Sequence, residues 1–457
     1  VERDVAVINT ATLGVTYIEH LMNLNMAIAV NPATGDITVV GTDATNQIRF
    51  EPNVSGRFIR VEMAMIDPAK AVTSIADLNA EHLGIAQGGG PYDDASVAPA
   101  ERNKSIGDPR GILWNSGGTL GFITGMGSNN LIVVNSAGER IDVGFAKNLR
   151  EGPTGLALDE PRKRLYVLNR FHGSVSAVDL TTFNEIANVP FFDPTPPEIK
   201  IGRKHLYDTH KNSGLGHIAC GSCHIDARMD RLAWDLGNPA GAVKPLSGGG
   251  NPPLHNLGAG IPGLAVGQTS PAFENFHPMK GPMTTQTLQG IIGMEPHHWR
   301  GDRNGLEEFN PAFVGLQGDD VVPGTGGGGL TAAEMQQFED FLATTHFPPN
   351  PFRNFDNTLP TDLELPRQFA HGRFTLANGE PLPNGNAARG LQLYSNQNAP
   401  LDSGNFTCVI CHTLPTGAGT DTFLSFPGGI PTFLPIPTGP NGEHHLNLVS
   451  VDGSTNH

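Results

Sequence analysis

The strongest constraint on this chain is the placement of its cysteines, because all four lie in two Cys-x-x-Cys-His motifs. The motifs are Cys220-Gly221-Ser222-Cys223-His224 and Cys408-Val409-Ile410-Cys411-His412. In such a motif the two thiols can add to the vinyl groups of one porphyrin, while the adjacent imidazole falls under the iron. The pattern therefore predicts two covalently attached haem c groups, with His224 and His412 as iron ligands.

Three other uses of these cysteines leave part of the pattern unexplained. A disulfide framework gives the two histidines no role, and a redox Cys-x-x-Cys motif does not require the following histidine. A cysteine-rich zinc site usually has its cysteine pairs much closer in sequence. Because haem c is attached outside the cytoplasm, we expect an exported protein, either periplasmic or extracellular. The covalent haems would act as staples for glycine-rich segments.

Charge and composition narrow the classes of protein. The formal net charge of -16 argues against nucleic acid as a partner, since phosphate binding needs a basic surface. A negative surface suits a basic redox partner protein or the subunits of a larger exported complex. No run approaches the ~18 apolar residues of a membrane span. The 57 glycines and 37 prolines favour loops, turns and short strands.

Residues 1–190 contain an internal repeat, in which each copy predicts strand, turn, strand, turn, strand. The copies are residues 27–52, 111–136 and 155–180. In the alignment, two sets of apolar residues coincide: Ile28 with Ile112 and Leu156, and Val39 with Ile123 and Val167. The last two copies start 44 residues apart (155 minus 111), the length of one β-propeller blade.

We therefore expect residues 1–190 to form an all-β, partial β-propeller, with a β-sandwich as the alternative. A partial propeller leaves strand edges that something must cover. The chain opens within a predicted strand, so we expect it to be part of a longer polypeptide.

After a proline-rich linker at residues 190–197, short helices are predicted before each cysteine motif, at residues 201–207 and 386–394. A third helix is predicted at residues 331–345, with Thr331 and Glu334 forming a capping box. We predict a mainly α-helical, loop-rich region here, with one domain at residues 198–350 and another at residues 351–457.

The segment Gly202–His224 is similar to the first haem segment of bacterial di-haem cytochrome c peroxidases. The resemblance to tandem cytochrome c domains covers residues 198–457, although the two motifs lie 188 residues apart and residues 281–318 depart from the peroxidase pattern. Leu165–Asn169 (LYVLN) resembles the Tyr-Val-x-Asn signature of one propeller family. In the peroxidase family a tryptophan helps electrons cross between haems, which implies this role for Trp234; a buried structural tryptophan is the alternative.

The sixth iron ligand decides between electron transfer and catalysis, because only an open position admits peroxide. For the first haem we favour Met283, which follows His224 by 59 residues in a Gly-Pro turn. The alternatives for this haem are His255, His277, His297 and His298. For the second haem, His444, His445 or a residue elsewhere are the candidates.

Two further groups of residues complete the predicted sites. Arg300 is a candidate partner for a haem propionate, in a cluster with Trp299 and Asp302. The acidic pairs Glu307-Glu308 and Asp319-Asp320 could bind calcium, or they could simply lie on a solvated surface.

The sequence thus predicts an exported di-haem c-type cytochrome that transfers electrons between redox partners, with the propeller as docking or assembly surface. The alternative is a peroxidase-like enzyme that reduces hydrogen peroxide or oxidises a substrate at one open haem. A propeller-based binding protein with structural haems is the third possibility.

Overall fold

The computed structural model describes residues 3–45, 47–87, 91–141, 147–243, 278–293, 297–299, 303, 305–319, 328–372, 376–395, 408–411, 422–425 and 432–435. The chain divides into two compact units, which are described separately. The first unit consists of residues 1–242, 277–289 and 305–345 and contains the first cysteine motif. The second consists of residues 243–276, 290–304 and 346–457 and contains the second motif.

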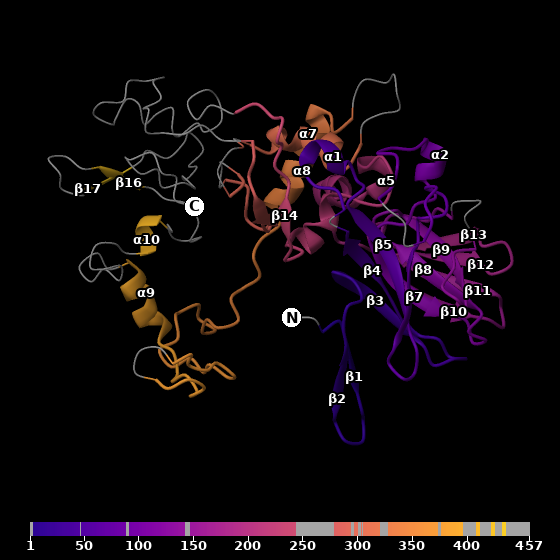
Figure 1. The fold of residues 1–457 in the computed structure, drawn as a ribbon, viewed down its shortest axis with the longest axis horizontal. Helices are drawn as coiled ribbons and strands as arrows, with labels where there is room; N and C mark the ends of the chain where they lie inside the picture. The colour runs from indigo at the N-terminus through magenta and orange to yellow at the C-terminus, as the bar shows by residue number, and fades with distance from the viewer. Residues whose placement is uncertain are drawn as a thin grey trace. The chain divides into compact units, whose positions relative to one another are not determined.

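The first unit opens with an antiparallel hairpin of β1 (Val5–Ile8) and β2 (Val15–Ile18), followed by three antiparallel sheets whose strands pair in chain order (Figure 1). The first sheet contains β3 (Leu24–Val30), β4 (Ile37–Ala44), β5 (Ile59–Ile66) and β6 (Val72–Asp77). The second contains β7 (Pro109–Trp114), β8 (Leu120–Gly125) and β9 (Asn130–Asn135). The third contains β10 (Pro153–Asp159), β11 (Arg164–Asn169), β12 (Ser174–Asp179) and β13 (Glu185–Pro190).

Strand register confirms the internal repeat. The aligned apolar residues are direct partners between the first and second strand of each sheet: Ile28 with Val39, Ile112 with Ile123, and Leu156 with Val167. Each copy therefore begins one sheet at the same position. The spacing of apolar residues in the sequence reflects a repeated strand pairing.

The three sheets pack face to face. The first strand of the middle sheet, β7, lies beside both β3 and β10, so the first strands of successive sheets are neighbours. One buried apolar cluster joins the first and second sheets, and its members include Val40, Met63, Ile112, Trp114 and Ile132. A second cluster joins the second and third sheets, and its members are Phe122, Leu131, Val133, Leu165, Val167 and Val178. This region is all-β and consistent with successive blades of a β-propeller.

The end of the first repeat copy differs from the prediction of a third strand there. Residues Glu51–Val54 form the short helix α1, and the third strand of this sheet, β5, begins only at Ile59. Proline in the first turn is compatible with a helix, because that amide has no helical partner. The loop carrying α1 extends toward the first cysteine motif.

Besides α1, the opening hairpin and the three sheets, the described part of the first unit contains mostly short elements. They are α2 (Pro99–Arg102, before the second sheet), α3 (Pro197–Gly202), α4 (Lys204–Tyr207), α5 (Thr209–Asn212), the 3-10 helices η1 (Cys220–Ser222), η2 (Ile225–Ala227) and η3 (Leu306–Phe309), β14 (Ala233–Asp235), β15 (Pro282–Thr284), α7 (Asn310–Gly315) and α8 (Ala332–Ala343). The predicted helix at 201–207 is divided between α3 and α4. The expected mainly α-helical tandem cytochrome fold is not shown by these elements.

Helix α8 follows its prediction closely. Thr331 is the N-cap, and its hydroxyl accepts from the Glu334 amide while the Glu334 carboxylate accepts from the Thr331 amide. Its apolar stripe is buried, as the helical spacing predicts, and comprises Met335, Phe338, Phe341 and Leu342.

The segment leading to the first cysteine motif is bonded directly to the sheets. The Thr209 amide donates to the Gly127 carbonyl at 2.9 Å, and His217 Nε2 lies 2.9 Å from the Ile59 carbonyl. His210 Nε2 lies 2.9 Å from the Ser105 carbonyl. The compact units therefore divide the chain differently from the predicted ranges: residues on both sides of the 190–197 linker share one unit, whereas a division occurs at residue 346.

The second unit contains α9 (Ala387–Ser395), α10 (Cys408–Cys411) and a hairpin of β16 (Thr422–Ser425) and β17 (Thr432–Pro435). Helix α9 confirms the predicted helix before the second motif, and it contacts α10. Throughout the described parts of the chain, we find no helix that combines the length and apolarity needed to cross a bilayer.

Close packing of α3 on α8 gives a direct test of this fold. A Cβ atom on Gly202 would lie 2.2 Å from the Gln337 carbonyl oxygen and 2.4 Å from Phe341 Cβ. We expect Gly202→Ala to lower the free energy of unfolding by about 1–3 kcal/mol, because the helices must separate. Thermal and denaturant unfolding measure this. Gly315→Ala, where a Cβ meets nothing within 4 Å, is the matched control, and an equal loss there would contradict the packing.

Candidate haem attachment site

A single tight turn sets the spacing of the first motif. The amides of Cys223 and His224 both donate to the Cys220 carbonyl, at 3.3 and 2.9 Å, which closes η1. The Ser222 hydroxyl accepts from the Ala219 amide at 3.0 Å and caps the start of the turn. The backbone therefore fixes the two thiols and the imidazole in one local arrangement.

The His224 ring is oriented by the backbone of a distant segment. Its Nδ1 lies 2.8 Å from the Gln286 carbonyl oxygen, which can only accept, so Nδ1 carries the proton and donates. This contact fixes the tautomer and assigns Nε2 as the nitrogen suited to bind a metal. Such an outer hydrogen bond also makes an imidazole a stronger ligand.

The Cys223 thiol lies at the edge of an apolar cluster, which we call the Cys223 cluster. Its buried members are Val54, Phe58, Ile59 and Ile218, and the partly buried residues packed on it are Ile48, Cys223, Trp234, Leu236 and Leu316. Gln317 Nε2 donates to Cys220 Sγ at 3.3 Å. Burial raises the pKa of the Cys220 thiol to about 11, and burial with the neighbouring Asp230 raises the pKa of the Cys223 thiol well above its ordinary value.

These residues fit covalent haem in their chemistry. Two reduced thiols and one oriented imidazole provide the atoms that a c-type attachment uses, and the Cys223 cluster provides apolar surroundings. In the portion of the chain that the structure describes, no three His, Cys, Asp or Glu side chains gather as a metal site.

Of the predicted calcium ligands, Asp319 accepts from the Gly329 amide and pairs with Arg102 at 3.8 Å. Asp320 lies outside the described residues.

Trp234 lies next to the first motif. Its ring meets Phe58 edge to face, with centroids 5.1 Å apart at 89°, and it belongs to the Cys223 cluster with one of the two thiols. The indole Nε1 donates to Asp230 Oδ2 at 2.8 Å. The structure therefore places the predicted electron bridge beside the attachment residues.

Met283 lies directly opposite Trp234 in the β14–β15 pair. Opposed residues of an antiparallel pair share one face, so Met283 is on the Trp234 side of this small sheet. Three residues later, the Gln286 carbonyl contacts His224 on its Nδ1 side. Met283 therefore lies near His224 in the chain's fold, and it could supply a thioether to haem iron bound at this motif.

The roles predicted for the remaining site residues stay predictions. His255, His277, Arg300 and Asp302 lie outside the described residues. His297, His298 and Trp299 belong to the second unit. His297 is buried, its amide donates to the Arg303 carbonyl at 2.7 Å, and burial lowers the pKa of its imidazole to about 4. Glu307 and Glu308 lie in η3.

The second motif is described in part. Cys408 is half-buried at the start of α10, and the helix ends at Cys411. His412, His444 and His445 lie outside the described residues. Burial and the nearby Cys408 thiol raise the pKa of the Tyr394 phenol at the end of α9.

The two motifs share a contact that we did not predict. Tyr207 ends α4, and its ring approaches Gly221 within the first motif, just as Tyr394 near the end of α9 approaches Cys408. The signal was present in the sequence, because a Leu-Tyr pair precedes each motif by a similar distance, at residues 206–207 and 393–394. Asp230, Gln286 and Gln317 were also missed, since their contacts are long-range or lie in loops.

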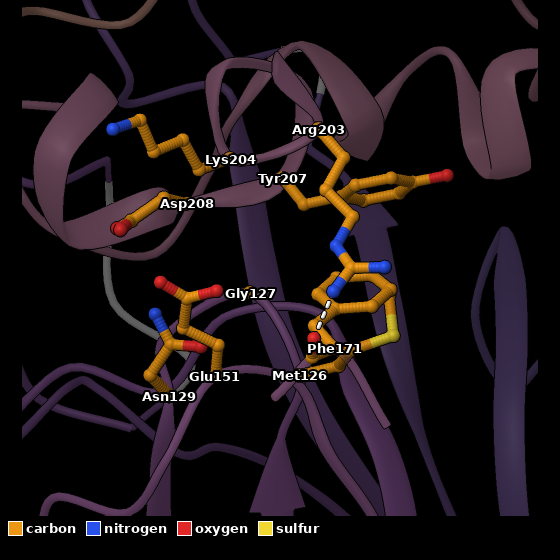
Figure 2. Close-up of a pocket in the computed structure, with 9 residues that line it drawn as sticks. All are labelled: Met126, Gly127, Asn129, Glu151, Phe171, Arg203, Lys204, Tyr207 and Asp208. Carbon is orange, nitrogen blue, oxygen red and sulfur yellow. Dashed lines mark hydrogen bonds between the residues drawn. The ribbon is translucent and has the colours of Figure 1, made fainter. Parts of the chain in front are cut away.

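Figure 2 shows a small pocket between the turn after β8, the turn after β11 and α4. Arg203 lies over the Phe171 ring at 4.5 Å and donates to the Phe171 carbonyl. Side chains of both charges line it, namely Arg203, Lys204, Glu151 and Asp208. The pocket contains none of the attachment residues, and its contacts fasten α4 to the sheets.

Comparisons with known proteins give little further guidance. No protein-family model matches the chain, and no curated protein matches it. A nidogen/laminin complex is 15% identical over 42% of this chain and 56% of that chain, with a TM-score of 0.28. Kuenenia stuttgartiensis hydrazine synthase is 14% identical over 38% of this chain and 50% of that chain, with a TM-score of 0.28. Pseudomonas aeruginosa periplasmic gluconolactonase is 8% identical over 42% of this chain and 50% of that chain, with a TM-score of 0.28. This chain thus spans about half the length of each, and likenesses this weak support no argument about function.

The raised thiol pKa values predict slow modification of the first motif in folded protein prepared without haem. A thiol of pKa about 11 has roughly a hundredfold less thiolate at pH 8 than an ordinary cysteine. We expect Cys220 to react with iodoacetamide about a hundredfold more slowly in the folded protein than in denaturant, and Cys223, whose pKa is also raised, to be slowed as well. Peptide mass spectrometry measures each site, and equal rates would contradict the described burial.

Proposed function

We propose that this chain is an exported di-haem c-type cytochrome that passes electrons between redox partners. The observation that carries the proposal is the arrangement of Cys220, Cys223 and His224, with the imidazole held by the Gln286 carbonyl at 2.8 Å. Haem iron bound there would supply reversible one-electron chemistry. The repeat of the helix, tyrosine and cysteine order at Cys408 supports a second attachment site.

The surroundings of the first motif support the role of an electron carrier. Val54, Phe58 and Ile59 of the first sheet and its loop exclude water from one side of the motif. Trp234 offers an aromatic path between the attachment residues and Phe58. The negative net charge of -16 suits a basic redox partner or assembly into a larger exported complex.

The N-terminal sheets have two roles in this proposal. Their exposed faces would be the surface for docking or assembly. Residues of the first sheet and its loop would also form one wall of the first haem site. Deleting residues 1–190 would therefore remove part of the site, so deletion does not separate partner binding from redox behaviour.

A peroxidase-like reaction is the second candidate. One observation favours it: Met283, the predicted sixth ligand, lies opposite Trp234 in the β14–β15 pair, a position that gives it a packing role without any iron. A haem without a protein sixth ligand would be open to hydrogen peroxide.

Absorption and electron paramagnetic resonance spectra of the purified protein distinguish the two functions. Electron transfer predicts two low-spin haems that are reduced by a small donor, reoxidised by an acceptor protein and unchanged by hydrogen peroxide. A high-spin haem that turns over peroxide would favour the enzyme. Absence of bound haem would contradict both.

The predicted role of Met283 as sixth ligand of the first haem has its own test. If Met283 binds the iron, Met283→Leu removes the thioether, abolishes the sulfur-to-iron charge-transfer band and lowers the potential of that haem, because methionine ligation raises it. Met279→Leu, a nearby methionine in the same segment, is the control. An unchanged spectrum in Met283→Leu would restrict Met283 to packing opposite Trp234.

A further inference from the structure

One buried carboxylate connects the attachment residues to Trp234. Asp230 follows His224 by six residues and is 5% exposed. Its Oδ2 accepts from Trp234 Nε1 at 2.8 Å, and its Oδ1 accepts from the Leu232 amide at 2.9 Å. The Asp230 side chain also hydrogen-bonds the Cys223 thiol. No motif in the sequence marks this residue.

The position of the Trp234 ring depends on this carboxylate. The indole has one polar group, Nε1, and Asp230 binds it. Phe58 supports one side of the ring edge to face, and β15 supports the strand from which the ring projects. Phe58 and the strand limit where the ring can lie, whereas the bond to Asp230 fixes its rotation beside Cys223.

We propose that Asp230 is a positioning residue of the first haem site, which holds Trp234 beside the Cys223 sulfur and places a negative charge next to the haem. The inference rests on the proposed function, because it requires haem at the first motif. Once Cys223 forms a thioether, its S–H is gone, but the N–H groups of Trp234 and Leu232 remain as donors to the carboxylate. The charge therefore keeps hydrogen-bond partners in the haem-bound protein.

Two separable effects follow. A buried negative charge favours the more positive, ferric form of a nearby haem, since charges interact strongly where water is excluded. Asp230 should thus lower the reduction potential of the first haem. Fixing the Trp234 ring should speed electron exchange through it, which is a property of geometry and independent of charge.

The charge effect is tested with Asp230→Asn in the full-length haem-bound protein. Asparagine keeps an oxygen acceptor for Trp234 Nε1 and removes the charge. We expect one of the two fitted midpoint potentials to rise and the other to stay, with haem content unchanged in the pyridine haemochrome assay. Asp226→Asn is the matched control, because Asp226 is in the same loop but is exposed and paired with Arg110 at 3.1 Å; it should give a smaller shift. No shift in Asp230→Asn, or an equal shift in both variants, would overturn the proposal.

The positioning effect is tested with Asp230→Ala and Trp234→Phe. Both should slow reduction of the first haem by a small protein donor several-fold, and Asp230→Asn should slow it less. Trp234→Phe keeps the carboxylate, so its potential should stay near that of the wild type. Trp234→Phe also tests the proposal if the Asp230 variants lose haem. An unchanged rate of reduction of the first haem in Trp234→Phe, or a raised midpoint potential of that haem, would overturn the proposal. A wild-type protein without haem would instead refute the proposed function itself.

Discussion

The buried contact between the His217 ring and the first sheet is the interaction on which the rest of the first site depends. The His217 side chain is fully buried, and its Nε2 meets the Ile59 carbonyl at 2.9 Å. Burial lowers the pKa of this imidazole to about 4, so it is neutral and can donate to the carbonyl. The turn that begins at Cys220 follows three residues later and takes its position from this contact. A buried polar ring without such a partner would cost free energy of folding.

This contact joins two regions that the sequence presents as separate. The repeat ends at β13, and a proline-rich linker follows, as is typical of a domain boundary. Yet Thr209 bonds Gly127, and Val54 and Phe58 line the Cys223 cluster. The first Cys-x-x-Cys-His motif and the all-β region therefore lie in one compact unit. If haem is attached at this motif, we expect changes in the first sheet to alter the haem site.

The sequence was informative wherever a local pattern decides the structure. The repeat predicted that Ile28 and Leu156 occupy equivalent positions, and likewise Val39 and Val167; the structure pairs Ile28 with Val39 and Leu156 with Val167 in the same way in both sheets. The capping box at Thr331 predicted the start of α8. The motif predicted Cys220, Cys223 and His224 as attachment residues; the structure places them in a tight turn, and haem attachment itself stays a prediction.

Long-range contacts could not be predicted in the same way. The bond from His224 to Gln286 joins residues far apart in sequence, and backbone carbonyls carry no residue signature. Helix α1 replaced an expected strand because the loop before Ile59 reaches the Cys223 cluster, a tertiary demand that overrides local preference. The sequence around Asp230 does not distinguish it from a surface aspartate, because its burial and its bond to Trp234 depend on the fold.

The central claim is that both cysteine motifs hold porphyrin through thioether bonds. Intact-protein mass spectrometry tests it most directly, on denatured protein from a host that matures c-type cytochromes during export. The account predicts the mass of the polypeptide plus two haems, with the added mass on peptides containing Cys220 and Cys408. The mass of the bare polypeptide, obtained under the same conditions, would contradict it.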